Sequence, residues 1–227
     1  NAYTGTTTIN AGTLSAANTT ALGTTGSGTT IAATGTLEIN GAAIGAEAIT
    51  FNGGTITGTG TSSLSGDITL GANSNLNGTG TLTLSGLISG STFGITKAGS
   101  GTVILSGTNT YTGVTTINAG VLSVATIGNG GVAGNLGQAT SSAANLVLGG
   151  GTLQYTGSTA STDRAFTLTN ATSSSIDVTT NNLTISGASA ATSGALTKIG
   201  NGTLTLSGAN AYTGTTTINA GTLSAAN

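Results

Sequence analysis

The sequence of 227 residues contains no cysteine, histidine, methionine, tryptophan or proline. Without histidine or cysteine, the chain has no imidazole base, no thiolate nucleophile and no ordinary zinc, copper or haem ligand set. Catalysis would have to depend on carboxylates, hydroxyls and two lysines, so we expect no enzyme activity and assign no catalytic, cofactor-binding or metal-binding residue. The lack of cysteine also suits an exported chain that must avoid stray disulfides.

Charge is nearly as scarce, because three basic and five acidic residues give a formal charge of −2. The chain offers no basic track for phosphates, so we expect no nucleic-acid partner. Polar residues interrupt every apolar run before it reaches the length of a bilayer span, so we expect no membrane insertion by this segment. No secretory signal opens the chain and it does not begin with methionine. Any signal or anchor is expected to lie outside it.

Aliphatic content is also low, since Leu, Ile, Val and Phe together make up 47 of the 227 residues, or 21%. A disordered chain would combine such a level with a high net charge, which is missing here. We therefore expect a folded protein with a thin core.

What the chain does have is internal repetition. Residues 1–18, NAYTGTTTINAGTLSAAN, recur letter for letter at residues 210–227, and a diverged copy, NTYTGVTTINAGVLSVAT, occupies residues 109–126. Repetition at a fixed spacing is typical of stacked repeat architectures. We predict a single continuous solenoid over residues 1–227, with diverged half-repeats at approximately 1–108 and 109–209. Residues 210–227 then begin the next period, and the array is expected to continue beyond both ends.

Short alternating segments between glycines predict the strands. In GTLTLSG, from Gly202 to Gly208, two leucines share one face and the hydroxyl side chains share the other, which is the period of a half-buried strand. The predicted inward pairs are Leu204 and Leu206, Val103 and Leu105, Leu37 and Ile39, Ile68 and Leu70, Leu82 and Leu84, Leu146 and Leu148, Ile176 and Val178, and Leu183 and Ile185. Ile218 is predicted to belong to the same stacked core.

These patterns predict an all-β fold, because apolar residues show no sustained helical spacing. The few aromatic residues and the lack of proline disfavour an antiparallel sandwich. We predict a right-handed parallel β-helix (β-solenoid) with strands of mostly three to six residues. At roughly 20 residues per coil and about 4.8 Å between strands, a 209-residue period makes about ten coils and about 50 Å of rod, with about five coils in each half.

Two long runs resemble a known family. Lys97–Leu122 (KAGSGTVILSGTNTYTGVTTINAGVL) and Lys198–Leu223 (KIGNGTLTLSGANAYTGTTTINAGTL) are similar to the autotransporter-associated β-strand repeat, also called the passenger-associated transport repeat. Asn135–Leu168 also resembles sequence of that family. The resemblance implies a parallel β-helix displayed on, or released from, a bacterial surface as the stalk of a large exported protein. It supplies no catalytic residue.

The polar residues that could form a site have simple structural interpretations. The five carboxylates are scattered singly, whereas glycan cleavage needs two that face one bond, so we expect solvated or loop positions for Glu38, Glu47, Asp67, Asp163 and Asp177. Asp163 and Arg164 are expected to form a loop pair. Tyr3, Tyr111 and Tyr212 share a phase and are expected to cap the coil interior with wet hydroxyls, rather than to stack on sugars. Lys97 and Lys198 are expected to be solvated charges beside glycine corners.

The expected function is therefore structural: a repeat segment of an extracellular bacterial fibre or adhesin stalk, which extends from the cell surface or forms filaments. One alternative is a glycan-binding or glycan-cleaving β-helix. A more remote one is an ice-binding solenoid, which would need a Thr-x-Thr pair in every coil at constant phase. The expected partners are neighbouring repeats of the same chain or identical subunits end to end, with lateral self-association and attachment to surfaces or glycans.

Overall fold

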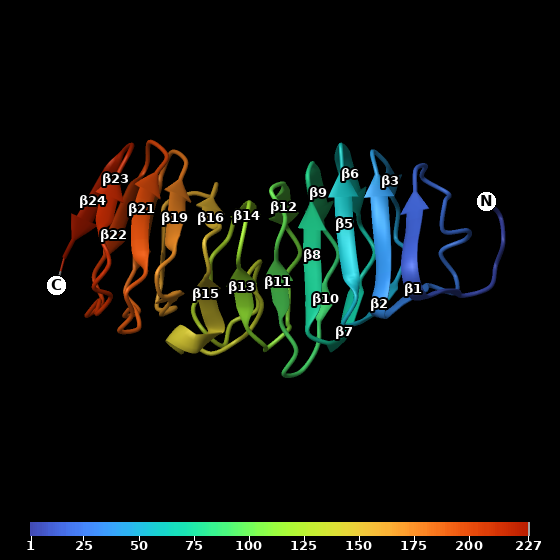
Figure 1. Cartoon of the computed structure of the whole chain (residues 1–227), viewed down its shortest axis with the longest axis horizontal. Coiled ribbons are helices and arrows are strands. Elements are labelled where there is room, and N and C mark those ends of the chain that lie inside the picture. The colour runs from blue at the N-terminus through green and yellow to red at the C-terminus, as the bar shows by residue number, and fades with distance from the viewer. Residues whose placement is uncertain (227) are drawn as a thin grey trace.

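The computed structural model describes residues 1–226 as an elongated rod of stacked coils, with the two ends of the chain at opposite ends of the rod (Figure 1). Every pair of neighbouring strands is parallel, and the strands inside each sheet pair with strands from the coils before and after them. The predicted all-β solenoid is confirmed. Among the described residues the only helical element is a single 3-10 turn, Ala143–Asn145, and no helix is long and apolar enough to cross a membrane.

The strands form three parallel sheets. The eleven-stranded sheet contains β1 (Thr7–Ala16), β2 (Thr29–Asn40), β4 (Ile49–Asn52), β5 (Thr55–Thr59), β7 (Ile68–Ala72), β8 (Ser74–Gly78), β10 (Ile88–Ser89), β11 (Ile95–Lys97), β13 (Thr115–Ile117), β15 (Leu146–Leu148) and β18 (Thr167–Leu168). The nine-stranded sheet contains β3 (Ala43–Ile44), β6 (Thr61–Leu64), β9 (Thr81–Leu84), β12 (Thr102–Leu105), β14 (Val121–Val124), β16 (Thr152–Tyr155), β19 (Ser173–Val178), β21 (Ala195–Ile199) and β23 (Thr216–Ile218). The four-stranded sheet contains β17 (Ala160–Thr162), β20 (Asn182–Ile185), β22 (Thr203–Leu206) and β24 (Thr222–Ala225).

Each full coil passes over three faces of the rod in the same order. Face 1 consists of the first halves of β1 and β2 with β4, β7 and β10, and later of the four-stranded sheet. Face 2 consists of the second halves of β1 and β2 with β5, β8, β11, β13, β15 and β18. Face 3 is the nine-stranded sheet. The strands β1 and β2 are longer than predicted, at 10 and 12 residues, because each runs from face 1 onto face 2 without a break.

Inward side chains stack directly on one another from coil to coil. All sixteen residues of the predicted inward pairs are buried, with at most 4% of any of them exposed. The column on face 2 contains Leu14, Leu37, Ile56, Leu76, Lys97, Ile117, Leu148 and Leu168. The column on face 3 contains Ser62, Leu82, Val103, Leu122, Leu153, Ile176, Lys198 and Ile218. Each of these aliphatic columns thus contains one lysine.

Ile218 is an exception to the predicted core, because its side chain is 53% exposed. It lies in the last strand described on face 3, so it packs on Lys198 from one side alone. Its counterpart in the middle copy, Ile117, lies between Lys97 and Leu148 and is 0% exposed. Burial in this fold therefore requires a coil on each side.

The three copies of the repeated motif lie on three different faces. Its Thr-Thr-Ile segment pairs on face 1 in the first copy (Thr7–Ile9), on face 2 in the second (Thr115–Ile117) and on face 3 in the third (Thr216–Ile218). The stacked columns show that the first and second copies are about five and one-third coils apart along the rod. The second and third copies are about four and one-third coils apart. A 209-residue period thus contains about nine and two-thirds coils, close to the predicted ten.

Fewer coils separate the second and third copies because one of those coils contains more residues than the others. Stacked residues are 19 to 23 positions apart in most coils, but Ile117 and Leu148 are 31 apart, as are Leu122 and Leu153. The additional residues form the irregular segment 125–145, which ends in the 3-10 turn. The two halves therefore contain different numbers of coils, not about five each as predicted.

Candidate functional site

The motif lysines are buried, which contradicts the prediction that they are solvated charges. Both are 0% exposed. The ammonium of Lys97 donates to the carbonyl oxygens of Ala98 at 2.8 Å, Gly99 at 2.8 Å and Ala119 at 3.0 Å. The first two oxygens belong to its own corner, and the third belongs to the next coil. Lys97 therefore links two consecutive coils from inside the rod, and we call this arrangement the lysine corner.

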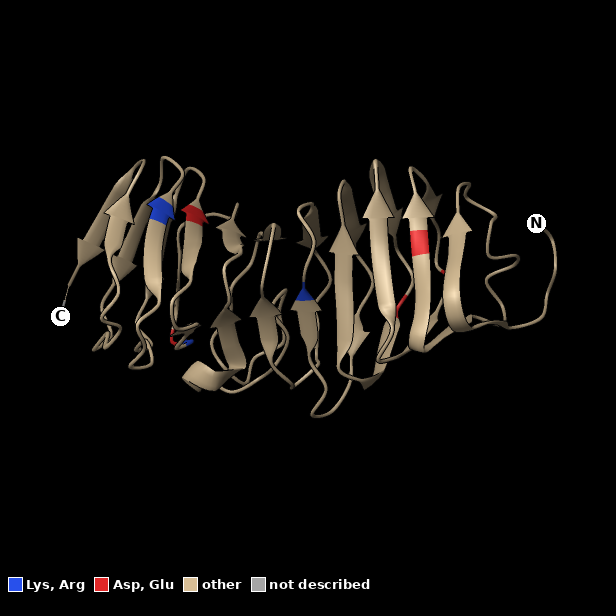
Figure 2. Ribbon diagram, viewed as in Figure 1, with Lys and Arg blue, Asp and Glu red and all other residues tan. Residues whose placement is uncertain are grey.

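The same corner forms around the second lysine. Lys198 donates to the carbonyl oxygens of Ile199 at 2.6 Å, Gly200 at 2.7 Å and Ala220 at 3.3 Å. Burial lowers the pKa of Lys97 to about 8. Burial also lowers the pKa of Lys198, while the negative charge of Asp177 acts in the opposite direction. Figure 2 shows how few other charges lie along the rod.

The lysine corner gives a physical reason for the Ala-Gly pair of the motif. Ala119 supplies the carbonyl oxygen, and Gly120 follows it with a φ of +61°. A Cβ atom on Gly120 would lie 2.7 Å from the Lys97 ammonium nitrogen and 2.4 Å from the carbonyl oxygen of Gly101. The corner therefore needs glycine both for its backbone conformation and for its space.

The sequence contained a signal for these buried lysines. Ile95 and Lys97 are two positions apart in one strand, as are Leu196 and Lys198, so the alternation that places the aliphatic residue inward also places the lysine inward. The charge of the lysine side chain favours exposure, and the prediction of solvated positions follows from that preference. Three carbonyl acceptors overcome that preference, because they replace the water that burial removes.

The motif tyrosines form a second recurrent contact. The hydroxyls of Tyr3, Tyr111 and Tyr212 hydrogen-bond the threonine four residues later, at 2.7, 2.7 and 2.8 Å. Tyr111 is 0% exposed, so the prediction of a wet hydroxyl is wrong for the middle copy. Burial raises the pKa of Tyr111 to about 12, against the opposing effects of the Thr115 hydrogen bond and the Arg164 charge. The prediction of a capping ring is consistent with this buried position.

The five carboxylates bind separate partners, although Glu47 and Asp67 lie at the corners of neighbouring coils. Each has a local structural role. Asp67 accepts a hydrogen bond from the amide of Leu87 at 2.9 Å, Asp163 from that of Gly130 at 2.7 Å, and Asp177 from the side chain of Gln154 at 2.8 Å. The contact of Glu38 with Thr59 is longer, at 3.5 Å. Glu47 departs from the expected solvated position, because it is 2% exposed and accepts from the Thr29 hydroxyl at 2.7 Å. Across residues 1–226 no three acidic side chains cluster as a metal site would require.

Arg164 has a role that the sequence did not reveal. Its guanidinium is 4% exposed and donates to the carbonyl oxygens of Gly128, Val132, Gly137 and Ala139. Asp163 faces the other way and holds the amide of Gly130. The two residues therefore do lie together beside a loop, but each binds the backbone of segment 125–145 separately. They fix the shape of the long coil.

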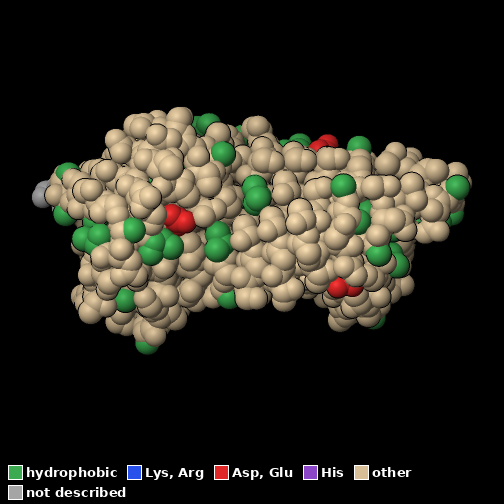
Figure 3. Space-filling model, turned by 90° about the horizontal axis from the view of Figure 1, so that it is seen from above, with side chains coloured by type: hydrophobic (Ala, Val, Ile, Leu, Met, Phe, Trp, Pro, Cys, Tyr) green, Lys and Arg blue, Asp and Glu red, His purple; other side chains and the backbone are tan. Residues whose placement is uncertain are grey.

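Hydroxyl side chains form columns on the outside of the rod. On face 3 one column contains Thr61, Thr81, Thr102, Val121, Thr152, Ser175, Thr197 and Thr217. The neighbouring outward column on that face is mixed, with Ser63, Thr83, Ile104, Ser123, Gln154, Asp177 and Ile199. The positions of threonine along the rod are thus more regular than expected. Face 3 nevertheless does not repeat a Thr-x-Thr pair from coil to coil. Figure 3 shows hydrophobic side chains only as scattered spots on one side of the rod.

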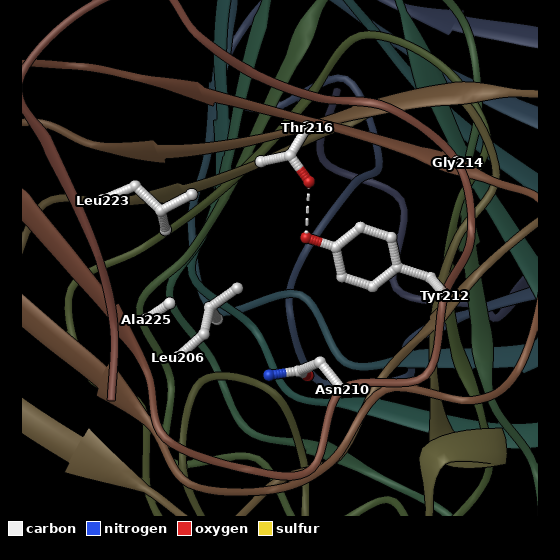
Figure 4. A pocket seen from close by; sticks show the side chains of 7 residues that line it. All are labelled: Leu206, Asn210, Tyr212, Gly214, Thr216, Leu223 and Ala225. Carbon is white, nitrogen blue, oxygen red and sulfur yellow. Dashed lines mark hydrogen bonds between the residues drawn. The ribbon is translucent and has the colours of Figure 1, made fainter. Parts of the chain in front are cut away.

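The last described coil is open at the C-terminal end of the rod. A pocket there is lined by Leu206, Asn210, Tyr212, Gly214, Thr216, Leu223 and Ala225 (Figure 4). The residues 101 positions earlier are Leu105, Asn109, Tyr111, Gly113, Thr115, Leu122 and Val124, and all of them are buried. The pocket is therefore the interior of a coil whose next neighbour is not among the described residues.

Comparison with known proteins agrees with this geometry. The passenger-associated-transport-repeat family model matches residues 1–16, 95–124 and 196–225. The two longer matches each begin in the strand that contains the motif lysine and end in the strand after the Ala-Gly pair, so each one spans a complete lysine corner. The resemblance found in the sequence is confirmed.

The chain is also 40% identical over 209 residues to a protein described as the adhesin BmaC autotransporter of Brucella suis biovar 1 (strain 1330). The match covers 85% of this chain and 6% of that protein, so the chain corresponds to a small part of the relative's length. No solved structure matches the chain.

Proposed function

We propose that this chain, which carries three passenger-associated transport repeats, is a structural rod segment of a bacterial surface adhesin. Its role is to hold other parts of a long exported protein at a distance from the cell. The single observation that carries the proposal is the lysine corner, because the family motif coincides with an internal link between coils and not with an exposed site. The similarity to an adhesin autotransporter supports an extracellular, surface-exposed position.

The physics of the rod fits this role. Strands inside the sheets are hydrogen-bonded to strands of the coils on both sides, and one cluster of buried hydrophobic residues extends from Ile9 to Leu206. Stacking of this kind makes stability a sum over neighbouring coils, so length can increase without a new core. The lysine corners add three charge-assisted hydrogen bonds at the two places where the motif joins coils.

Lateral contact between rods is part of the same proposal. The net charge of −2 gives little electrostatic repulsion, and the half-buried hydroxyl columns offer regular donors and acceptors along the rod. We therefore expect rods to associate side by side and to attach to surfaces or glycans through hydroxyl and amide groups. Rods that stay dispersed at physiological salt and bind no glycan surface would contradict this part.

Each carboxylate is bound to its own backbone or side-chain partner, which does not favour glycan cleavage, and the mixed outward column on face 3 does not favour ice binding. A structural role needs neither arrangement.

The experiment compares chains that contain one, two or four consecutive copies of residues 1–209 and end with a single copy of residues 210–227. Each chain is displayed between a cell-surface anchor and a distal epitope. About nine and two-thirds coils at about 4.8 Å per coil predict that each added period moves the epitope outward by about 46 Å. Electron microscopy with an antibody against the epitope measures this distance. A distance that does not grow with the number of periods would contradict the proposed function.

A further inference from the structure

Asparagine followed by glycine is a dipeptide that is especially prone to spontaneous deamidation, because glycine has no Cβ atom to hinder the attack of its backbone nitrogen. That nitrogen bonds to the side-chain carbonyl carbon of the asparagine, and the bond from this carbon to the side-chain nitrogen breaks. The nitrogen leaves as ammonia with the glycine amide proton, and water opens the resulting succinimide ring to aspartate or isoaspartate. The chain contains five such pairs: Asn40–Gly41, Asn52–Gly53, Asn77–Gly78, Asn129–Gly130 and Asn201–Gly202.

Four of these pairs are held by the regular stacking of the coils. The glycine amide must lose its proton before it attacks, so an acceptor on that N–H slows the reaction. The amides of Gly41 and Gly202 donate to the carbonyl oxygens of Thr59 and Val178, both at 2.9 Å, and that of Gly53 donates to the Ser74 hydroxyl at 3.2 Å. The fourth pair, Asn77–Gly78, lies in β8, which is paired on both sides.

The fifth pair, Asn129–Gly130, lies in the irregular segment of the long coil and outside every strand. Asn129 is exposed. Glycine is required at position 130, because a Cβ atom there would lie 2.1 Å from the amide nitrogen of Ser141 and 2.5 Å from its Cα atom. The packing of the long coil therefore places a chemically labile pair at an exposed position without a strand partner.

Asp163 holds both groups that would react. Its carboxylate accepts from the amide of Gly130 at 2.7 Å, and its own backbone amide donates to the side-chain oxygen of Asn129 at 3.1 Å. Arg164 fixes the backbone on either side of the pair, through the carbonyl oxygens of Gly128 at 2.9 Å and Val132 at 3.4 Å. The attacking nitrogen and the carbonyl group that it would attack are thus both bound to Asp163.

We propose that Asn129 is a modification site at which Asp163 suppresses deamidation. The Gly130 N–H donates a charge-assisted hydrogen bond, and the negative charge of the carboxylate disfavours the anionic nitrogen that attacks. The bond from the Asp163 amide ties the Asn129 side chain to the following coil, which opposes its rotation toward the Gly130 nitrogen. Asp163 is thus a positioning residue that sets the chemical lifetime of the long coil. This inference does not depend on the proposed function of the rod.

The test follows deamidation at each Asn-Gly pair in the full chain at mildly alkaline pH, with peptide mass spectrometry to detect aspartate and isoaspartate. Asp163→Ala removes the acceptor and its charge but leaves the backbone bond to Asn129. Asp163→Asn retains an acceptor oxygen without the charge. The matched control is Asp67→Ala, which removes a similar bond between a carboxylate and the amide of Leu87. Asn201 is the internal reference, because a backbone carbonyl oxygen holds the amide of Gly202.

We expect Asp163→Ala to deamidate at Asn129 about tenfold faster than the parent, the effect of losing one charge-assisted hydrogen bond, with no change at Asn201. Asp163→Asn should give an intermediate rate at Asn129, and Asp67→Ala should match the parent there. Equal rates at Asn129 in the parent and in Asp163→Ala would overturn the proposal, as would a slower rate in the variant. A rise at Asn201 as large as that at Asn129 would show that general loosening of the coils exposes the pair, and would overturn it too.

Discussion

Leu14 and Ile117 lie in one buried column of face 2, although Leu14 is the fourteenth residue of the first motif copy and Ile117 the ninth of the second. Ile218, the ninth residue of the third copy, lies in the column of Leu122, the fourteenth residue of the second. Equivalent residues therefore do not stack on one another. Each new copy begins one face further round the rod than the last.

The motif can lie on any of the three faces because strands on all three faces require the same side-chain pattern. Each face needs aliphatic residues at alternate positions, and the corner after the Thr-Thr-Ile strand needs a residue such as Gly120 that allows a tight turn. The motif meets these needs wherever it lies. An array of identical 209-residue periods consequently turns by one third of a revolution per period and shows each surface feature in three directions.

Replacement of Lys97 tests the lysine corner. Lys97→Ala leaves the carbonyl oxygens of Ala98, Gly99 and Ala119 without their donor and opens a cavity, so the free energy of unfolding should fall by about 3 kcal/mol. Lys97→Met fills most of the space and should lose about 1 kcal/mol, which isolates the hydrogen bonds. Urea unfolding measures both. A Lys97→Met variant as stable as the parent would show that the Lys97 side chain stabilises the rod through packing and not through its hydrogen bonds.

The buried lysine also predicts a pH dependence. Its pKa is about 8 in the folded chain and near 10.5 when unfolded, so between these values the folded state holds fewer protons. Stability should therefore rise with pH over this range, by about 2 kcal/mol in total. Above about pH 10 the trend reverses, because Tyr111, with a folded pKa of about 12, keeps its proton after the unfolded tyrosine has lost it. Urea midpoints from pH 7 to 11 should show a maximum near pH 10, and the rise should be reduced in Lys97→Met.

Alanine substitutions at two glycines with similar φ angles distinguish the cost of steric crowding from the cost of backbone strain. Gly120 and Gly131 have φ values of +61° and +80°, but a Cβ atom on Gly131 would meet nothing within 4 Å. Gly131→Ala should therefore cost only about 1 kcal/mol, the strain of the left-handed backbone. Gly120→Ala should cost about 3 kcal/mol, because the methyl group collides with the lysine corner. Thermal unfolding compares the two, and equal losses would contradict the corner geometry.

The core can be tested at equivalent isoleucines. Ile117→Asn places an amide between Lys97 and Leu148 with no partner, so a loss of about 3–4 kcal/mol is expected. Ile218→Asn changes a residue that is 53% exposed, and a loss below about 1 kcal/mol is expected. In a chain that continues with a second period, Ile218→Asn should become as damaging as Ile117→Asn. Similar effects of the two substitutions in the present chain would contradict the stacking order.

The core was predictable from the sequence because alternation and glycine spacing define it locally. All eight inward pairs follow from the rule that every second residue of a short strand faces the same way, and the repeat period limits the coil number. The resemblance to the transport repeat was equally accessible, since the Lys97–Leu122 run is long and specific.

The alternation of Ile95 and Lys97 indicates an inward lysine, but the contacts of the lysine corner and the fixed shape of the long coil were not predictable in this way. Lys97 reaches a carbonyl oxygen of the next coil, and Arg164 reaches four carbonyls at least 25 positions earlier. Such contacts depend on where coils stack and not on local pattern. The shift of motif copies from face to face has the same origin, because it follows from coil lengths that only the stacked structure defines.

The most direct measurement is electron cryomicroscopy of a chain with three copies of residues 1–209, each labelled by a small tag inserted at Gly130–Gly131. We predict a continuous rod in which consecutive tags are about 46 Å apart along the axis, at about 4.8 Å per coil, and about one third of a turn apart around it. Three tags should therefore point in three directions. Tags aligned along one side of the rod, or spaced at random, would contradict the claim that successive copies of one motif occupy successive faces.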